Sequence, residues 1–214
     1  HTPDVRGLMP DSAPTAQVDR KQQILIALAE MLEEAPAKRI TTARIAAAIG
    51  VSEAALYRHF PSKRTMYAAL LEFAEDTLFG LIGRIPAEQP GALEQCHRLL
   101  CIYLEFCDKN PGITRLLTGR ALTGESLRLH QQVEQLYKRL ETQLKKYLRE
   151  AEMREQLRTR IPVATAANLL MAAAEGRVSQ FCRSDFRRSP LEGWVDQWTQ
   201  LTGGLMKPTV TGNP

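Results

Sequence analysis

Hydrophobic residues recur along most of the chain with the three-to-four-residue spacing of an α-helix. The first such stripe consists of Ile24, Leu28, Met31 and Leu32, and Pro36 is expected to end its helix. From residue 18 onward, no segment alternates apolar and polar side chains over the length of a strand. The pattern therefore predicts an all-α protein.

Capping residues and helix breakers divide the N-terminal region into short helices. Thr41 or Thr42 can cap one helix that stops at Gly50, and Ser52 can cap the next, which breaks at Pro61. A longer helix follows this break. The expected helices cover residues 43–49, 52–59 and 63 to about 85.

The rest of the chain also has helical periodicity, but the surface character differs between segments. A helix beyond Pro90 is apolar on two sides, which indicates that it is buried or lies in a groove. Pro162 begins a helix that is rich in small residues. The expected helices here cover residues 93–107, 111 to about 122, 129–148, a segment from 162 and residues 191–205.

The last expected helix carries two large tryptophans on one apolar stripe. They require cover from the rest of the subunit or from a second copy. We expect a symmetric dimer, in which this helix and the small-residue helix meet their copies. The residues expected at that interface are Ala167, Met171, Ala174, Trp194, Trp198 and Leu201.

The composition is that of an ordinary globular protein. Of the 214 residues, 44% are hydrophobic and 24% are charged, and no apolar run approaches the roughly 18 to 20 residues that span a bilayer. Four cysteines form no CxxC pair, so we expect reduced core thiols in a cytosolic protein. With 28 Lys and Arg against 24 Asp and Glu, the net charge of +4 suits a polyanionic partner.

The stretch over residues 41–63 has the spacing of a helix-turn-helix. Ala46 stands where the two helices would touch, Gly50 supplies the turn, and the second helix leaves one face free for a DNA major groove. Serine, tyrosine and arginine on that face can bond base edges or phosphates, whereas Glu53 must accept from a cytosine amine or cap the helix. The residues expected to contact DNA are Thr41, Thr42, Ser52, Glu53, Ala55, Tyr57, Arg58, His59 and Lys63.

This segment resembles the DNA-binding domain of TetR-family regulators. The resemblance rests on the motif Leu56-Tyr57-x-x-Phe60-Pro61-Ser62-Lys63, which follows Ala46-x-x-x-Gly50. Stretches at 72–78, 109–122 and 184–186 are similar to a nucleoid-occlusion branch of that family. The resemblance implies a TetR-like fold, with an N-terminal three-helix helix-turn-helix domain and a C-terminal helical dimerisation and regulatory domain.

The nucleoid-occlusion likeness implies an inhibitor of cell division in the cytoplasm, associated with the nucleoid. Its homodimers, single or paired, would bind palindromic double-stranded DNA resembling GTGAG…CTCAC, and the DNA-bound form would antagonise polymers of the tubulin-like division protein FtsZ. The chain departs from this branch at Leu81 and Glu105, which replace a basic and a small residue. The matching positions at which the FtsZ tail would dock are Phe73, Ile102, Lys109 and Asn110.

These patterns predict four parts of the chain. Residues 1–17, which contain three prolines and no apolar periodicity, are expected to form a disordered tail. A helix-turn-helix DNA-binding domain is expected over 18–64, and a helical dimerisation and partner-binding domain over 65–207. Residues 208–214 are expected to be a flexible C-terminus.

Alternatives stay open for several of these residues. Phe73 and Ile102 could be core residues, and His59 could cap a helix end. The twelve basic against six acidic residues over 138–188 could form solvated helix faces, or they could assist a second DNA-bound dimer or an acidic partner. The competing functions are a ligand-sensing repressor with an apolar pocket and a helical interaction module without a DNA role.

No pattern of catalysis or metal binding stands out. Cys96, His97 and Cys101 do not share one helix face, and no second Cys/His pair follows, so core packing is expected rather than a metal site. The chain has no Gly-rich phosphate loop and no paired catalytic carboxylates. We therefore expect no enzyme, cofactor, metal, small-molecule ligand or membrane association.

Overall fold

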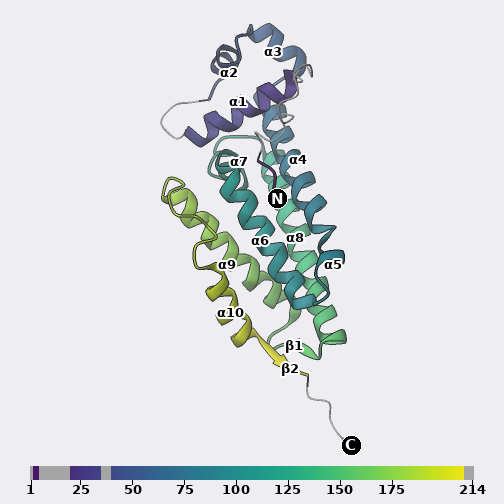
Figure 1. Ribbon diagram of the computed structural model, residues 1–214. Helices are drawn as coiled ribbons and strands as arrows, with labels where there is room; N and C mark the ends of the chain where they lie inside the picture. The colour runs from purple at the N-terminus through teal and green to yellow at the C-terminus, as the bar shows by residue number, and fades with distance from the viewer. Residues whose placement is uncertain (1, 5–19, 35–39, 210–214) are drawn as a thin grey trace, which may run out of the picture. The chain divides into compact units, whose positions relative to one another are not determined.

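The computed structural model describes residues 2–4, 20–34 and 40–209. Regular structure within these ranges is almost entirely helical (Figure 1), which confirms the all-α prediction. Pro36, most of the expected tail and residues 210–214 lie outside the described residues. In chain order the elements are α1 (Arg20–Glu34), α2 (Thr42–Ala48), α3 (Glu53–His59), α4 (Lys63–Ile82), α5 (Ile85–Glu88), α6 (Ala92–Lys109), α7 (Pro111–Leu117), α8 (Leu127–Arg154), β1 (Leu157–Thr159), α9 (Val163–Arg183), α10 (Trp194–Leu205) and β2 (Met206–Pro208).

A short pair of strands is the feature that helical periodicity does not predict. β1 and β2 pair in antiparallel fashion, with Leu157 opposite Pro208 and Thr159 opposite Met206. Each strand has three residues, which is too short for an alternating pattern to be visible in the sequence. The ladder joins the segment after α8 to the segment after α10.

The chain divides into two compact units. The first unit comprises residues up to 77 and 109–134, and the second unit comprises residues 78–108 and those from 135 onward. The expected domain boundary after residue 64 lies inside the first unit, because α4 continues through it without a break. The four-part division of the chain stays a prediction.

Close packing of α7 against α1 organises the first unit. α1 contacts α2 and α3 as well as α7, and its buried face contains Ile24, Leu28 and Leu32. Gly112 of α7 lies against the main chain of Ala29, where a larger residue has no space. The buried Arg115 guanidinium donates to the Glu33 carbonyl at 3.5 Å, which ties α7 to the C-terminal turn of α1.

The second unit is built around α6, whose two apolar sides are buried as expected. Its first turn is capped from a distance, because the Glu155 carboxylate accepts from the Ala92 and Leu93 N–H groups. The hydroxyl of the buried Tyr103 and that of the half-buried Tyr137 are bonded at 2.9 Å. Such a bond satisfies polar groups that would otherwise be costly to bury.

Arg177 is the one basic residue of the 138–188 segment that lies in the core. Its guanidinium donates to the carbonyls of Pro190 and Glu192, and so holds the turn between α9 and α10. Burial lowers its pKa, and nearby Arg188 lowers it further. Its role in this structure is therefore architectural.

All four cysteines are free thiols, and three of them are buried. Among the described helices, none combines the length and the apolar character that a membrane span requires.

Gly112→Ala is predicted to destabilise the protein, because the new Cβ would collide with the carbonyl oxygen of Ala29. We expect the free energy of unfolding, measured by urea denaturation, to fall by about 3 kcal/mol. Gly80→Ala is the matched control. That exposed helical position has open space around a Cβ, so the same change should leave stability equal or raise it by up to about 1 kcal/mol. Equal effects at both positions would contradict the packing argument.

Candidate nucleic-acid interface

Side-chain caps define the start of both helices of the helix-turn-helix. The Thr41 hydroxyl accepts from the Arg44 N–H at 3.3 Å, and the Ser52 hydroxyl accepts from the Ala55 N–H at 3.2 Å. Gly50 lies between the two helices with φ of +68°, a conformation that other residues adopt at a cost. The caps and the turn therefore form as the sequence predicts.

Burial is confined to one side of the short α3. Leu56 and Phe60 are buried, as are Ile45 and Ala46 of α2, while Val51 is half-buried. Seven residues are too few for a helix to be stable in isolation, so these contacts hold α3 in place. The opposite side of α3 is left open to solvent.

Three polar side chains on the open side form a connected chain of hydrogen bonds. The Thr42 hydroxyl donates to Glu53 Oε2 at 2.8 Å, and Thr42 Oγ1 lies 3.2 Å from the Tyr57 hydroxyl. Because a threonine hydroxyl has a single proton, Tyr57 is the donor in the second contact. Glu53 is therefore held as an acceptor at the start of α3, while the Tyr57 side chain is 45% exposed.

A reciprocal cap begins α4. The Ser62 hydroxyl accepts from the Thr65 N–H at 3.2 Å, and Thr65 Oγ1 accepts from the Ser62 N–H at 3.2 Å. Lys63, the first residue of α4, makes an ion pair with Glu125 at 2.5 Å and lies 5.4 Å from the Tyr67 ring centroid. Burial, and secondarily the Glu125 charge, raises the pKa of Tyr67 to about 12, so this phenol stays neutral.

All nine predicted DNA-contact residues lie in the first unit, and none of them is buried. Ser52, Glu53, Tyr57 and Arg58 are exposed, while the others are half-buried. Glu125 is the residue of this site that the sequence did not indicate. It lies 62 positions after Lys63, so no local pattern connects the two.

The four predicted partner contacts differ in exposure. Phe73 and Lys109 are half-buried, whereas Ile102 is only 1% exposed and is a core residue in this structure. Asn110 is 2% exposed, and its side chain donates to the carbonyl of Pro3. Glu105, which departs from the related branch, is neutralised by Arg98 at 3.0 Å.

The six predicted dimer contacts differ in exposure. Four of them are buried within the single chain, namely Ala167, Met171, Ala174 and Trp194. Trp198 and Leu201 are half-buried. The exposed side of α9 instead presents a stripe of small and apolar residues, and Val195 of α10 is 64% exposed. The members of the α9 stripe are Thr165, Leu169, Ala172 and Gly176.

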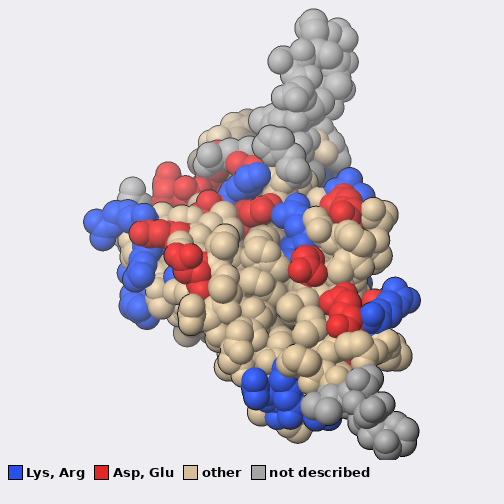
Figure 2. Space-filling view, turned by 60° about the horizontal axis from the view of Figure 1, so that its bottom comes forward, with Lys and Arg blue, Asp and Glu red and all other residues tan. Residues whose placement is uncertain are grey.

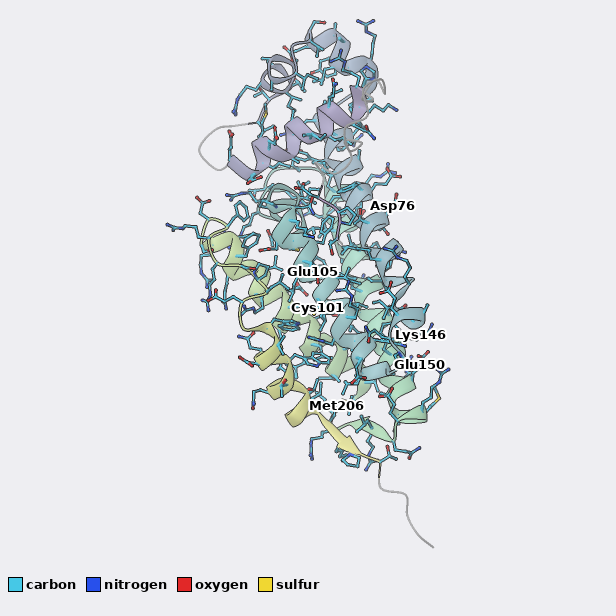
Figure 3. The ribbon with its side chains drawn as sticks, viewed as in Figure 1. Asp76, Cys101, Glu105, Lys146, Glu150 and Met206 are labelled. Atoms are coloured by element: carbon cyan, nitrogen blue, oxygen red, sulfur yellow. The ribbon has the colours of Figure 1, made fainter. Side chains whose placement is uncertain are left out.

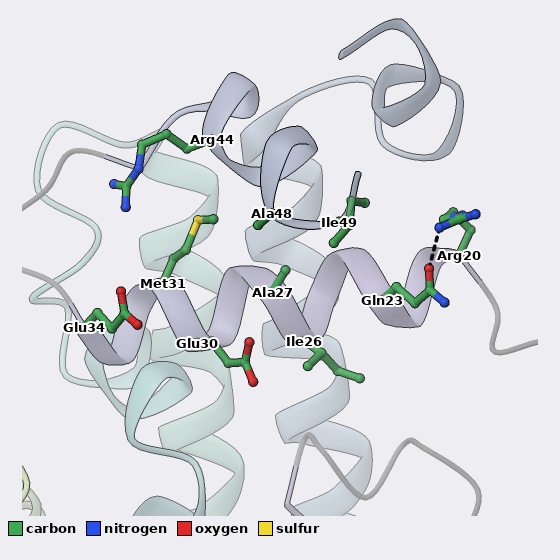
Figure 4. A pocket seen from close by; sticks show the side chains of 10 residues that line it. All are labelled: Arg20, Gln23, Ile26, Ala27, Glu30, Met31, Glu34, Arg44, Ala48 and Ile49. Carbon is green, nitrogen blue, oxygen red and sulfur yellow. Dashed lines mark hydrogen bonds between the residues drawn. The ribbon is translucent and has the colours of Figure 1, made fainter. Parts of the chain in front are cut away.

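An open groove of about 680 Å³ lies along α1 and α2 (Figure 4). It has a mixed apolar and charged lining, in which Arg20 donates to Gln23 Oε1 at 2.7 Å. The predicted DNA contacts do not line it. Its residues are Arg20, Gln23, Ile26, Ala27, Glu30, Met31, Glu34, Arg44, Ala48 and Ile49.

The cysteine and histidine of α6 contact each other and an aromatic ring. Cys101, labelled in Figure 3, lies 3.4 Å from His97 Nε2, and the His97 ring stacks on Trp198 at 5.0 Å. Burial chiefly raises the pKa of Cys101 and lowers that of His97, so both groups tend to be neutral. Among the described residues, no cluster of three or more potential ligands could hold a metal ion.

Charged residues are dispersed on the surface in view in Figure 2, where basic and acidic side chains are interspersed. Most basic residues over 138–188 are exposed. This agrees with solvated helix faces, the alternative that the sequence left open.

Two families match the chain. Residues 24–70 match the family described as bacterial regulatory proteins, tetR family, and residues 91–206 match the tetracyclin repressor-like C-terminal domain of the SlmA-like group. The first match contains the capped helix-turn-helix. The second contains α6 to α10.

Relatives match over nearly their full length. Nucleoid occlusion factor SlmA of Idiomarina loihiensis is 52% identical over 188 residues, which are 88% of this chain and 96% of that protein. The protein of the same name from Shewanella halifaxensis is 46% identical over 91% of this chain and 99% of its own. The crystal structure of the MbdR regulator from Azoarcus sp. CIB shares the fold, with a TM-score of 0.74, 19% identity and coverage of 86% of this chain and 97% of that one.

Glu125→Gln is predicted to strengthen DNA binding, because a carboxylate that competes with phosphate for Lys63 is removed. We expect affinity to rise by about two- to fivefold in fluorescence anisotropy at low salt. Glu72→Gln, an exposed position on α4, is the matched control for net charge. An equal gain in the two variants, or a gain that persists when Lys63 is also changed to alanine, would contradict the role of the pair.

Proposed function

Because the chain belongs to the SlmA branch of the TetR family of bacterial regulators, we propose that it is a sequence-specific DNA-binding nucleoid-occlusion factor. One observation carries the proposal: the chain has a capped recognition helix with an exposed polar face, within a sequence 52% identical to a nucleoid occlusion factor. This is a regulatory protein and not an enzyme.

The proposed DNA-bound form has two copies of the chain on a palindromic site. α3 of each copy enters the major groove, where Ser52 and Arg58 contact base edges or phosphates. Lys63 exchanges Glu125 for a phosphate, and Tyr57 exchanges its bond to Thr42 for the same kind of contact. Glu53 is already bonded to Thr42, which reduces the repulsion that a bare carboxylate would exert on the backbone of DNA.

The proposed partner on the nucleoid is FtsZ, whose assembly the DNA-bound dimer inhibits so that no septum forms there. Lys109 and Asn110 supply hydrogen-bond donors at the junction of α6 and α7, and Phe73 offers a partly exposed aromatic ring on α4. Donors of this kind suit an acidic, partly apolar peptide tail. Ile102 is not assigned a direct contact with the tail, because its side chain is buried.

A homodimer is proposed through the exposed stripe of α9 together with Val195 of α10. Small side chains along a helix allow two backbones to approach closely, and a two-fold axis places each stripe against its copy. A ligand-responsive repressor, the competing function, has weaker support, because the solved regulator of 19% identity shows the fold alone.

The function is tested by sedimenting GTP-assembled FtsZ from the same source with this protein, alone and with a palindromic duplex. We expect the palindrome to amplify the loss or rearrangement of polymers, and a scrambled duplex to have no such effect. Arg58→Ala should abolish the amplification, whereas Arg183→Ala, which removes an exposed cation at the end of α9, should retain it. Polymers that do not respond to the palindrome although it is bound would overturn the proposal.

Leu169→Glu is predicted to separate the dimer, because each copy would bury an unpaired carboxylate near the two-fold axis. We expect the dimer dissociation constant to rise by about a hundredfold or more in analytical ultracentrifugation. Arg183→Glu introduces the same carboxylate at the end of α9 and should remain dimeric. A fully dimeric Leu169→Glu protein would place the interface elsewhere.

A further inference from the structure

The segment Thr2–Asp4 is bound to the junction of α6 and α7. Lys109 Nζ donates to the Thr2 carbonyl at 3.0 Å, and Asn110 Nδ2 donates to the Pro3 carbonyl at 3.1 Å. Thr2 is only 3% exposed.

Asn110 has an unusual role for its position. It is the N-cap residue of α7, where an asparagine side chain commonly accepts from the first N–H groups of the helix, yet it makes no side-chain cap bond. Its main-chain carbonyl instead accepts from both the N–H and the hydroxyl of Thr114 at 2.9 Å. The carboxamide donates to the Pro3 carbonyl of the segment.

Two donors on consecutive residues therefore hold two consecutive carbonyls of a non-helical segment. Carbonyls occur in every peptide, so this contact can accept different sequences, while the charge of Lys109 favours an acidic one. Pro3 cannot continue a helix, and an acidic residue, Asp4, follows it. The chain's own segment thus has the chemistry expected of an acidic peptide ligand.

We propose that Thr2–Asp4 is an internal competitor for the partner site at Lys109 and Asn110. The inference rests on the proposed function, in which the same two residues bind the tail of the division protein. A tail that uses these donors must first displace Thr2–Asp4. The measured affinity for the tail then equals the affinity of the free site multiplied by the fraction of molecules in which the site is free.

Thr2→Lys tests the competition in the full-length chain. The variant places a cation in a buried position beside Lys109, and so it should release the segment. We expect a labelled FtsZ tail peptide, measured by anisotropy in the presence of palindromic duplex, to bind about five- to tenfold more tightly. Pro3→Ala is the matched control, because the exposed proline ring is lost while both carbonyls remain. It should bind the tail as the unaltered chain does.

A second readout does not depend on the partner. In NMR spectra recorded without DNA or peptide, the Asn110 side-chain amide resonance of the unaltered chain should differ from that of Thr2→Lys. The reason is that Asn110 loses the Pro3 carbonyl as its acceptor in the variant. An unchanged resonance would overturn the docking of the segment. Equal tail affinity in both proteins would overturn the competition and leave the proposed function intact. Tail binding to neither protein would overturn the proposed partner and, with it, this inference.

Discussion

The close approach of α7 to α1 is the contact on which the DNA-binding unit depends. At Gly112 the two main chains are so near that a single methyl group has no space. α1 also contacts both helices of the helix-turn-helix, so the position of α3 follows from that of α1. Since α3 is too short to be stable alone, the geometry of the recognition surface depends on the absence of a side chain at one position of α7.

Several polar side chains on the recognition surface already have partners within the chain. Lys63 is paired with Glu125, and Tyr57 is linked through Thr42 to Glu53. In the proposed DNA complex, these side chains exchange one set of hydrogen bonds for another, and the net gain is smaller than the number of contacts suggests. In return, the side chains are held near fixed positions before the partner arrives, which lowers the entropic cost of ordering them.

Local patterns predicted local structure well. Ser52 was predicted as one cap, and Thr41 or Thr42 as the other, because a cap depends on residues three positions apart. The structure has caps at Ser52 and Thr41. The strand pair was missed because it joins two three-residue segments that are distant in sequence. The apolar stripe at Trp194 predicted burial correctly, but periodicity cannot tell whether the chain itself or a second copy provides the cover.

In the candidate sites, too, local features could be predicted from the sequence, whereas contacts between distant segments could not. The exposed face of α3 could be predicted from its sequence, since helix geometry fixes which residues share a face. Glu125 could not be predicted, because its contact with Lys63 depends on how α4 and the segment before α8 come together. Ile102 shows the reverse case, in which a residue matched by resemblance to a contact position is buried in the core.

The carboxylate of Glu155 has a consequence for how the chain is made. It caps α6 from 63 residues farther along the chain, and the residue preceding α6 is Gly91, which has no side chain to offer. While the protein is being synthesised, the first turn of α6 therefore lacks this cap until the whole of α8 has left the ribosome. Formation of that turn is coupled to a contact of long sequence separation, which slows folding but makes α6 and α8 form as one cooperative unit.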